Sequence, residues 1–347
     1  MRIVKARSDT QPGWPRLLGD IGGTNARLGW MSEPASPIEH IQILPCALYA
    51  DPVQAIQAYL QQESLPLPHS ASLAMAIPVT GDLLQMTNLN WRFSMDEVRA
   101  QLGLQCLMVL NDFTALALAL PTLPEQHLIP LGRTLEATTG QQMTKALLGA
   151  GTGLGVSGLL PVPHSDQWVP IMGEGGHVTL AAHSPLEFEV IQHLSQRHGH
   201  VSAERVLSGN GLVELHQTLC VLQGQPLGQQ LAASDILEMD AQGDERAQQT
   251  LNMFVAWMGS VAGDLALTLG ATGGVYIGGG IAPRLRSRLE APLFRERFEG
   301  KGRYQAYLQS IATWLIDAPV SPALEGAAKA IASAKDGQPP ICTMLRS

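Results

Sequence analysis

The chain has 347 residues, which is long for a single hydrophobic core and predicts two domains. Hydrophobic residues make up 45% and charged residues 15%, so there is enough apolar material to fill a core, and disorder across the whole chain is excluded. The 22 basic residues are scattered, and the net charge of -8 provides no electrostatic footprint for nucleic acid. If the chain binds an anion, groups next to that anion must hold it, because the protein as a whole has no excess positive charge.

The first fifteen residues contain no apolar stretch of the kind found in signal peptides, and we expect a poorly ordered leader over 1–15. The most apolar later stretch, 253–269, contains Asp264 and many small residues, so no membrane span is predicted. The four cysteines are far apart and form no Cys-x-x-Cys pair, which fits buried thiols in a reducing cytoplasm. They are Cys46, Cys106, Cys220 and Cys342.

Strand and helix patterns alternate along the chain, which predicts an α/β architecture. In the first third we expect helices near 53–62, 95–102 and 113–120 and strands at 72–77 and 106–110. Further along we expect a helix from 245 to 270, a strand at 274–277, a helix with Pro283 in its first turn and an alanine-rich helix at 325–334.

Twice the chain combines an apolar strand, a glycine-rich turn with a threonine and a second apolar strand, at 17–29 and at 147–156. Glycine lets backbone N–H groups converge on an anion without a Cβ in the way, and the threonine hydroxyl adds a donor. Neither turn has the lysine of a Walker loop, and both lead into return strands rather than the helix of a dinucleotide fingerprint. Either turn alone favours an ordinary hairpin, but the matched pair favours a polyphosphate site.

The two copies differ at one informative position. Aligning Gly19 with Gly149 places Asp20 opposite Ala150, so only the first hairpin has a carboxylate. Mg²⁺ usually keeps several waters and takes one or two carboxylates together with substrate phosphates. The sequence therefore predicts one magnesium position, near Asp20.

Asn111 and Asp112 stand between the expected strand at 106–110 and the expected helix at 113–120. Ligands of open α/β sheets bind at the carboxyl ends of the strands, which makes this pair a candidate site. Asp is also a preferred helix cap, and position alone does not separate the two interpretations of Asp112.

A second polar cluster, Gly173-Glu174-Gly175-Gly176-His177, favours the functional interpretation. Its carboxylate and imidazole lie on a loop between glycines, a composition suited to hydrogen-bonding a polyhydroxylated ligand. A zinc site would need more ligands, and His177 taken alone fits a structural role. Glu204 follows Ser202 near an expected helix start, where an acidic side chain favours the helix dipole.

The motifs, in their order, resemble the bacterial glucokinase family over about residues 16–335. They are Gly19-Asp20-Ile21-Gly22-Gly23-Thr24-Asn25-Ala26-Arg27-Leu28, Asn111-Asp112-Phe113-Thr114-Ala115, Gly149-Ala150-Gly151-Thr152-Gly153-Leu154-Gly155, Gly173-Glu174-Gly175-Gly176-His177, Ser202-Ala203-Glu204-Arg205-Val206-Leu207-Ser208-Gly209 and Gly273-Gly274-Val275-Tyr276-Ile277-Gly278-Gly279-Gly280. The resemblance implies a two-lobed, duplicated α/β fold of the actin-like ATPase (ribonuclease H-like) type, with mixed sheets flanked by helices and an interlobe cleft. One departure is the stretch 321–328 around Gly326, which is less glycine-rich than the family pattern.

By this resemblance the chain would be an ATP-dependent hexose kinase that phosphorylates glucose at the 6-hydroxyl. Asp112 would be the general base, and Asn111, Glu174, His177 and Glu204 would bind the remaining hydroxyls. The role of Glu204 rests on the resemblance alone.

The resemblance also implies which residues bind MgATP. They are Gly19, Asp20, Ile21, Gly22, Gly23, Thr24, Gly151, Thr152, Gly153, Gly278, Gly279 and Gly280. The amides of the two turns would hold the phosphates, Asp20 would orient Mg²⁺ through water, and the turn at 278–280 would lie against adenosine.

The family pattern gives a small lobe of 16–111 plus 325–347 and a large lobe of 112–324, with hinges near Asn111 and Pro322. The lobes are expected to close over glucose, since water could otherwise replace the sugar as nucleophile. Expected partners are glucose and ATP, with no nucleic acid and no membrane, and the expected assembly is a cytoplasmic homodimer. The hexose preference stays open because epimers differ by one hydroxyl.

Three other assignments share part of the pattern. A kinase of the repressor and open-reading-frame group carries a cysteine-rich zinc motif after its Glu-His loop, and none of the four cysteines is near His177. A sugar-responsive repressor would need a DNA-reading domain, which fifteen leader residues cannot build. An actin-like filament or chaperone ATPase would keep the hairpins without needing Glu174, His177 and Glu204.

Overall fold

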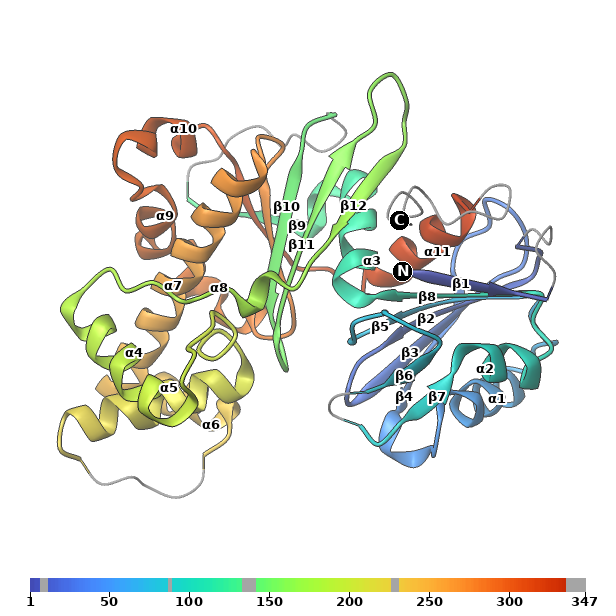
Figure 1. Ribbon diagram of the computed structural model, residues 1–347, viewed down its shortest axis with the longest axis horizontal. Helices are drawn as coiled ribbons and strands as arrows, with labels where there is room; N and C mark the ends of the chain where they lie inside the picture. Colours follow the sequence, from blue (N-terminus) through green and yellow to red (C-terminus); the bar gives the residue numbers. More distant parts are fainter. Residues whose placement is uncertain (7–11, 87–88, 133–141, 226–230, 335–347) are drawn as a thin grey trace. The chain divides into compact units, whose positions relative to one another are not determined.

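The computed structural model describes residues 1–6, 12–86, 89–132, 142–225 and 231–334. The chain forms two compact units, shown in Figure 1. The first unit consists of residues 1–123, 161–172 and 318–347, and the second of residues 124–160 and 173–317. Each unit has its own sheet and its own cluster of buried apolar side chains. The lobe boundaries expected from the sequence stay a prediction.

The first unit is built on a mixed sheet with the strand order β1-β8-β5-β2-β3-β4. Its strands are β1 (Arg2–Lys5), β2 (Arg16–Ile21), β3 (Asn25–Met31), β4 (Glu39–Pro45), β5 (Ser70–Met75) and β8 (Cys106–Asn111). β2, β5 and β8 are parallel, and β3 returns antiparallel to β2, so the first glycine-rich turn is a hairpin, as predicted. A small ladder of β6 (Leu83–Gln85) and β7 (Arg92–Ser94) accompanies this sheet.

Helices cover both faces of the first sheet. α1 (Pro52–Gln62) and α2 (Met95–Gln101) lie on one face, and α3 (Asp112–Ala119) and α11 (Ala323–Ala332) lie on the other (Figure 1). α11 packs tightly on α3, because a Cβ atom at Gly326 would lie only 1.7 Å from the carbonyl oxygen of Ala115. Helix packing therefore explains Gly326, the one glycine in the stretch 321–328, which is less glycine-rich than the family pattern.

The leader differs from the expectation. Residues Arg2–Lys5 form β1, an edge strand that pairs antiparallel with β8 in register from Arg2–Val109 to Lys5–Cys106. The outer edge of β8 offers backbone N–H and C=O groups that a further strand can pair with. The β-branched residues Ile3 and Val4 favour an extended strand there. Residues 7–11 lie outside the described residues.

The second unit contains strands in the order β11-β10-β13-β14-β9. They are β9 (Leu128–Pro130), β10 (Lys145–Ala150), β11 (Leu154–Pro161), β13 (Val275–Gly278) and β14 (Thr313–Ile316). β10, β13 and β14 are parallel, and β11 returns antiparallel to β10, so the second turn is also a hairpin. The pattern of one hairpin followed by two parallel strands thus occurs in both units. The short strand β12 (Trp168–Met172) belongs to the first unit.

Most helices of the second unit pack on its longest helix, α7 (Glu245–Leu269). The other α-helices described in this unit are α4 (Pro185–His198), α5 (Gly209–Leu222), α6 (Ala233–Ala241), α8 (Arg286–Glu290), α9 (Pro292–Glu299) and α10 (Gln305–Gln309). α7 begins after the capping residue Asp244 and ends at Gly270, whose φ of 60° is the left-handed conformation that favours glycine. Gly259 and Gly263 let α9 approach, since Cβ atoms there would lie 2.3 and 2.4 Å from carbonyl oxygens of that helix.

α7 is the described helix that by length and composition could cross a membrane, and 67% of its most apolar window is buried inside the protein. Such burial is typical of a core helix. Among the described cysteines, Cys46, Cys106 and Cys220 are buried, while Cys342 lies outside the described residues. The predicted helices and strands named above are found with ends shifted by up to two residues, except that Pro283 lies in a short 3₁₀ helix, Ala282–Leu285, that precedes α8.

Candidate functional site

The first hairpin, β2–β3, has a turn that is closed by its own backbone and held from two sides. The Gly22 N–H donates to the Asn25 carbonyl at 2.9 Å, the Cys46 N–H to the Thr24 carbonyl at 2.8 Å and the Ala76 N–H to the Ile21 carbonyl at 3.1 Å. Within the described residues, the amides of Gly23 and Thr24 donate to no protein group. These two donors are therefore available to a ligand.

Gly22 is not required by backbone strain or by crowding. Its φ is not positive, and the nearest atom to a Cβ there would be the Asn25 carbonyl oxygen at 3.8 Å. A Cβ at Gly22 would therefore have no close neighbour in the protein. Gly19, in contrast, is explained by packing, since its Cβ would lie 2.7 Å from the side chain of Leu73.

Asp20 lies on β2 and is 8% exposed. Its carboxylate faces Arg27 across the hairpin, at 3.4 Å from the guanidinium. Burial raises the pKa of Asp20, while hydrogen bonds from Ser321 and Arg27 and the charge of Arg27 oppose that shift. The described residues contain no group of three or more acidic, histidine or cysteine side chains that could hold a metal ion. A lone carboxylate next to an anion turn fits Mg²⁺ that is bound mainly by phosphates and water.

Asn111, rather than Asp112, caps α3. The Asn111 Oδ1 accepts hydrogen bonds from the N–H groups of Phe113 at 3.0 Å and Thr114 at 3.2 Å, while its Nδ2 donates to the Ile77 carbonyl at 3.4 Å. Asp112 is the first residue of the helix, and its Oδ1 accepts from the Phe113 N–H at 2.9 Å. The sequence left open whether Asp112 caps the helix, and the structure shows that Asn111 is the capping residue.

The register of the first sheet brings these residues to one edge. Ile21 pairs with Met75, and Met75 pairs with Asn111, so the three parallel strands end side by side. The first turn and Asp112 thus follow the carboxyl ends of strands two positions apart, which is about 10 Å. In open α/β sheets, ligands bind at the edge formed by the carboxyl ends of the parallel strands.

In the second hairpin, β10–β11, the Gly151 N–H closes the turn by donating to the Gly153 carbonyl at 2.8 Å. Ala150, which the sequence alignment sets opposite Asp20, is the last residue of β10 and pairs with Leu154, whereas Asp20 lies one residue before the end of β2. A Cβ at Gly151 would have no atom within 4 Å, so this glycine also borders open space. Within the described part of the chain, the N–H groups of Thr152 and Gly153 have no protein acceptor.

In the second unit the side chains of His177 and Glu204 lie close together, and Glu174 is joined to His177 through the backbone. The His177 Nε2 is 3.9 Å from the Glu204 Oε1, and the His177 N–H donates to the Glu174 carbonyl at 3.0 Å. Atoms 3.9 Å apart can both reach one hydroxyl oxygen at a hydrogen-bonding distance of about 2.8 Å. Glu174 and His177 are exposed and Glu204 is half-buried.

Glu204 does not serve a helix dipole. It lies in a turn five residues before α5, and its Oε2 accepts the Leu154 N–H at 2.9 Å. Its own N–H donates to the Gly176 carbonyl at 2.8 Å. The sequence offered no signal for these contacts because they join residues about 30 and 50 positions apart, and only the resemblance marked Glu204 as functional.

Two of the three glycines around Glu174, Gly175 and Gly176, are needed because this loop lies against β11, whereas a Cβ at Gly173 would have no atom within 4 Å. A Cβ at Gly175 would lie 2.7 Å from the Val156 side chain, and a Cβ at Gly176 would lie 2.2 Å from the Leu154 carbonyl oxygen. The loop therefore lies directly against the strand that leaves the second turn.

The turn at Gly278–Gly280 follows β13 at the same sheet edge as the second hairpin, because Gly149 pairs with Gly278. Gly279 has φ 83°, and a Cβ there would lie 2.4 Å from the Ala150 carbonyl oxygen. Close strand packing thus explains Gly279, whereas Gly280 borders open space. Contact of this turn with adenosine stays a prediction.

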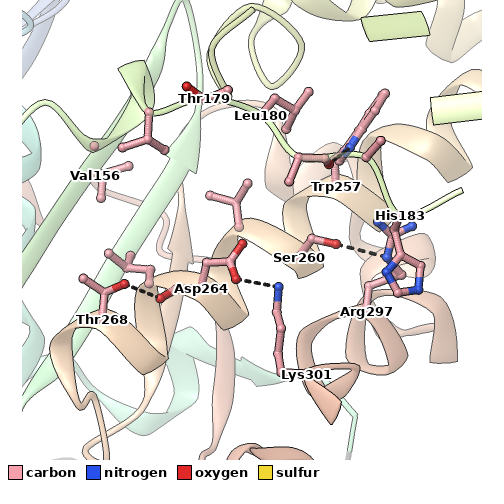
Figure 2. Close-up of a pocket in the computed structure, with 16 residues that line it drawn as sticks. Val156, Thr179, Leu180, His183, Trp257, Ser260, Asp264, Thr268, Arg297 and Lys301 are labelled. Carbon is pink, nitrogen blue, oxygen red and sulfur yellow. Dashed lines mark hydrogen bonds and ion pairs between the residues drawn. The ribbon is translucent and has the colours of Figure 1, made fainter. Parts of the chain in front are cut away.

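Sequence reasoning missed a pocket of about 270 Å³ (Figure 2). The pocket lies beside residues 173–178, here called the Glu174 loop. One face of α7 lines it with Trp257, Ser260, Val261, Asp264, Leu265 and Thr268, opposite the segment 178–183. Polar side chains around it pair with each other: Ser260 Oγ with Arg297 Nε at 3.0 Å, and Asp264 with Lys301 at 2.6 Å. None of the predicted site residues lines this pocket.

Comparison with known proteins covers most of the chain. A family profile described as Glucokinase matches residues 17–334. The chain is 48% identical over 333 residues to a glucokinase of Aromatoleum aromaticum, covering 95% of this chain and 98% of the relative. It is 46% identical over 321 residues to a glucokinase of Chromobacterium violaceum, covering 92% and 90%.

A solved structure, a glucokinase from an Antarctic psychrotroph, matches with a TM-score of 0.79 and 34% identity over 92% of this chain and 99% of that chain. The predicted α/β fold of the actin-like ATPase type is thereby confirmed.

Proposed function

Because this chain belongs to the glucokinase family and is an ATP-dependent hexose kinase, we propose that it transfers the γ-phosphoryl group of ATP to the 6-hydroxyl of glucose. The products would be glucose 6-phosphate and ADP. Both relatives named above carry the name glucokinase and align over nearly their whole length, which supports glucose as the substrate.

The observation that carries the mechanism is the shared edge of β2, β5 and β8, where the first turn and Asp112 both lie. A carboxylate at this edge, near amides able to hold a phosphate, suits proton removal during phosphoryl transfer. As the 6-hydroxyl oxygen forms its bond to the γ-phosphorus, its proton passes to an oxygen of Asp112. The bond from the γ-phosphorus to the bridging oxygen breaks, and ADP leaves.

An ordinary aspartate suffices as the base. Phosphoryl transfer passes through a loose transition state, so positioning and charge stabilisation contribute more than basicity. Asp112 is the first residue of α3, and its neighbour Asn111 caps that helix, so both are fixed to a packed element. The close contact of α11 with α3 at Gly326 adds to this rigidity.

The phosphates of ATP would be bound at the turns Gly22–Thr24 and Gly151–Gly153. The donors would be the amides that the turns leave available, those of Gly23, Thr24, Thr152 and Gly153. Support comes from the amides without protein acceptors in both turns and from the open space at Gly22 and Gly151. Asp20 would hold Mg²⁺ through water, and bound Mg²⁺ would neutralise charge on the phosphates. The turn at Gly278–Gly280 would contact adenosine, supported by its place at the same edge as the second hairpin.

The other hydroxyls of glucose would be bound by Asn111, Glu174, His177 and Glu204. Asn111 would contribute the second hydrogen of its Nδ2 group, since the first is donated to the Ile77 carbonyl and the Oδ1 is used by the helix cap. The cluster of Glu174, His177 and Glu204 offers two carboxylates and an imidazole, which suits a ligand with several neighbouring hydroxyls. A cytoplasmic homodimer remains part of the proposal.

The test is formation of glucose 6-phosphate from glucose and MgATP, measured beside mannose, fructose, N-acetylglucosamine and an ATPase control without sugar. Turnover with glucose far above the other sugars is the expected result. Activity confined to another hexose would keep the chemistry and replace the substrate. ATP hydrolysis without a sugar product would contradict the proposal.

A further inference from the structure

The turn segment 202–209, here called the Glu204 segment, contacts both the Glu174 loop and the second hairpin. Toward the loop, the Glu204 N–H donates to the Gly176 carbonyl at 2.8 Å and the Ala203 N–H to the Val178 carbonyl at 2.9 Å. Toward the hairpin, the Glu204 Oε2 accepts the Leu154 N–H at 2.9 Å and the Gly209 N–H donates to the Gly151 carbonyl at 2.9 Å. Four hydrogen bonds thus join two motifs that the sequence separates.

The Glu204 carboxylate is divided between the two motifs. One oxygen accepts the Leu154 N–H of the hairpin, and the other lies 3.9 Å from the His177 Nε2. Gly153 makes this arrangement possible, because a Cβ there would lie 2.4 Å from the Glu204 Oε2. A carboxylate with both oxygens engaged loses rotamer freedom, so fixing one oxygen reduces the cost of fixing the other.

We propose that Glu204 is a positioning residue that couples glucose binding to the shape of the second phosphate turn, so that glucose and MgATP bind cooperatively. The inference rests on the proposed function. A sugar hydroxyl at His177 and the Glu204 Oε1 orders the Glu204 side chain, which holds the Leu154 amide and with it the turn at Thr152–Gly153. Bound phosphates order the same turn and thereby orient the carboxylate for the sugar.

Packing between the Glu174 loop and the second hairpin supports the same coupling as the Glu204 carboxylate. Gly176 lies against the Leu154 carbonyl and Gly175 against Val156, so the Glu174 loop cannot shift without contacting β11. The Gly209–Gly151 bond ties the start of α5 to the other side of the turn. The coupling is confined to one unit and to residues in direct contact, which is a contiguous physical route.

The experiment measures glucose affinity by calorimetry, first with the protein alone and then with the protein saturated with Mg²⁺ and the non-hydrolysable analogue AMPPNP. The ratio of the two dissociation constants is the coupling factor. For the unaltered chain we expect AMPPNP to tighten glucose binding at least about fivefold. Glu204→Ala should reduce the factor to about one, because the carboxylate link is absent.

Two matched variants separate coupling from simple sugar contact. His177→Ala removes a sugar ligand that does not touch the hairpin, so glucose binding should weaken while the coupling factor stays within about twofold of the unaltered chain. Glu204→Gln keeps a side-chain oxygen for the Leu154 N–H, so most of the factor should return. A Gln variant that behaves like the Ala variant would contradict the hydrogen-bond route.

A third variant approaches the link from the hairpin and leaves Glu204 in place. Gly153→Ala puts a methyl group where the carboxylate oxygen lies, so the coupling factor should again fall to about one. The control is Gly209→Ala, where the new Cβ would meet only the Gly151 carbonyl oxygen at 3.5 Å and the N–H is retained. Thermal unfolding of each variant shows that it is folded.

The outcomes separate this inference from the proposed function. A chain that binds and phosphorylates glucose but shows a coupling factor of one overturns the coupling and leaves the kinase activity intact. A full coupling factor in Glu204→Ala or Gly153→Ala does the same. A chain that neither binds nor phosphorylates glucose overturns both.

Discussion

The two glycine-rich hairpins have similar sequences, but their turns differ in length and are held by different neighbours. The last paired residues are Ile21 and Ala26 in the first hairpin and Ala150 and Leu154 in the second. Each turn is closed by one backbone bond, from Gly22 to Asn25 in the first and from Gly151 to Gly153 in the second. The first is held by backbone bonds of Cys46 and Ala76, from segments that follow β4 and β5. The second is held by the side chain of Glu204 and by the start of α5.

The difference shows that equivalent motifs can have unequal consequences when altered. The first turn is anchored to the strands of its sheet and carries the only carboxylate of the pair, Asp20. The second turn has no carboxylate of its own, and the Glu204 carboxylate, from a distant segment, accepts the Leu154 N–H beside it. Changes in the first hairpin should therefore affect MgATP alone, whereas changes in the second should also reach the sugar.

The largest expected effect lies outside both turns, because neither supplies the base. Asp112→Ala should lower kcat by about 10² to 10⁴, the usual contribution of general-base catalysis, while glucose binding remains measurable. Stopped assays for kcat and calorimetry for glucose give the two values. Asp112→Asn is the matched variant of similar size, and near-native turnover in either would remove Asp112 as the base.

The next effect tests the carboxylate that only the first hairpin has. Asp20→Asn should weaken the affinity for Mg²⁺ by about 10- to 100-fold. This is the range found when a residue that holds a metal indirectly, through one of its ligands, is lost. The KM for glucose should change far less. Titration of activity with Mg²⁺ at fixed ATP measures the effect, and a loss confined to glucose affinity would contradict the assigned role.

A direct comparison of the turns uses the same small substitution in each. Gly153→Ala collides with the Glu204 carboxylate and should weaken glucose binding at least about fivefold with MgATP analogue present. In Gly22→Ala the new Cβ would lie 3.8 Å from its nearest neighbour, the Asn25 carbonyl oxygen. This variant should weaken MgATP binding and leave glucose affinity within about twofold of the unaltered chain. Equal loss of glucose affinity in both variants would remove the distinction between the hairpins.

The smallest effect concerns stability. Burial raises the pKa of Asp20, so the ionised carboxylate disfavours the folded state at pH values above its folded-state pKa. Asp20→Asn should then be slightly more stable than the unaltered chain at pH 7. This advantage should shrink as the pH falls through the folded-state pKa and vanish below the unfolded value. Urea unfolding over a pH series measures it, and a variant that is less stable at pH 7 would contradict the direction.

Local patterns predicted the hairpins well because strand alternation and glycine turns are nearest-neighbour properties. Asn111 and Asp112 were correctly placed between a strand and a helix, but which of the two caps α3 depends on side-chain geometry within one turn. The strand β1 was not expected, because its place depends on an open edge of β8. The pocket along α7 has no sequence signature, since it forms between segments far apart in the chain.

The sequence by itself determined the α/β class, the two hairpins, the single carboxylate at Asp20 and the order of motifs that identifies the family. These features are written in consecutive residues, where the spacing of apolar, glycine and polar positions limits the backbone. Tertiary structure decided which glycines serve packing, as at Gly279 and Gly326, and which border open space, as at Gly22 and Gly151. It also decided that Glu204 reaches Leu154, because contacts between distant segments depend on how the whole unit packs.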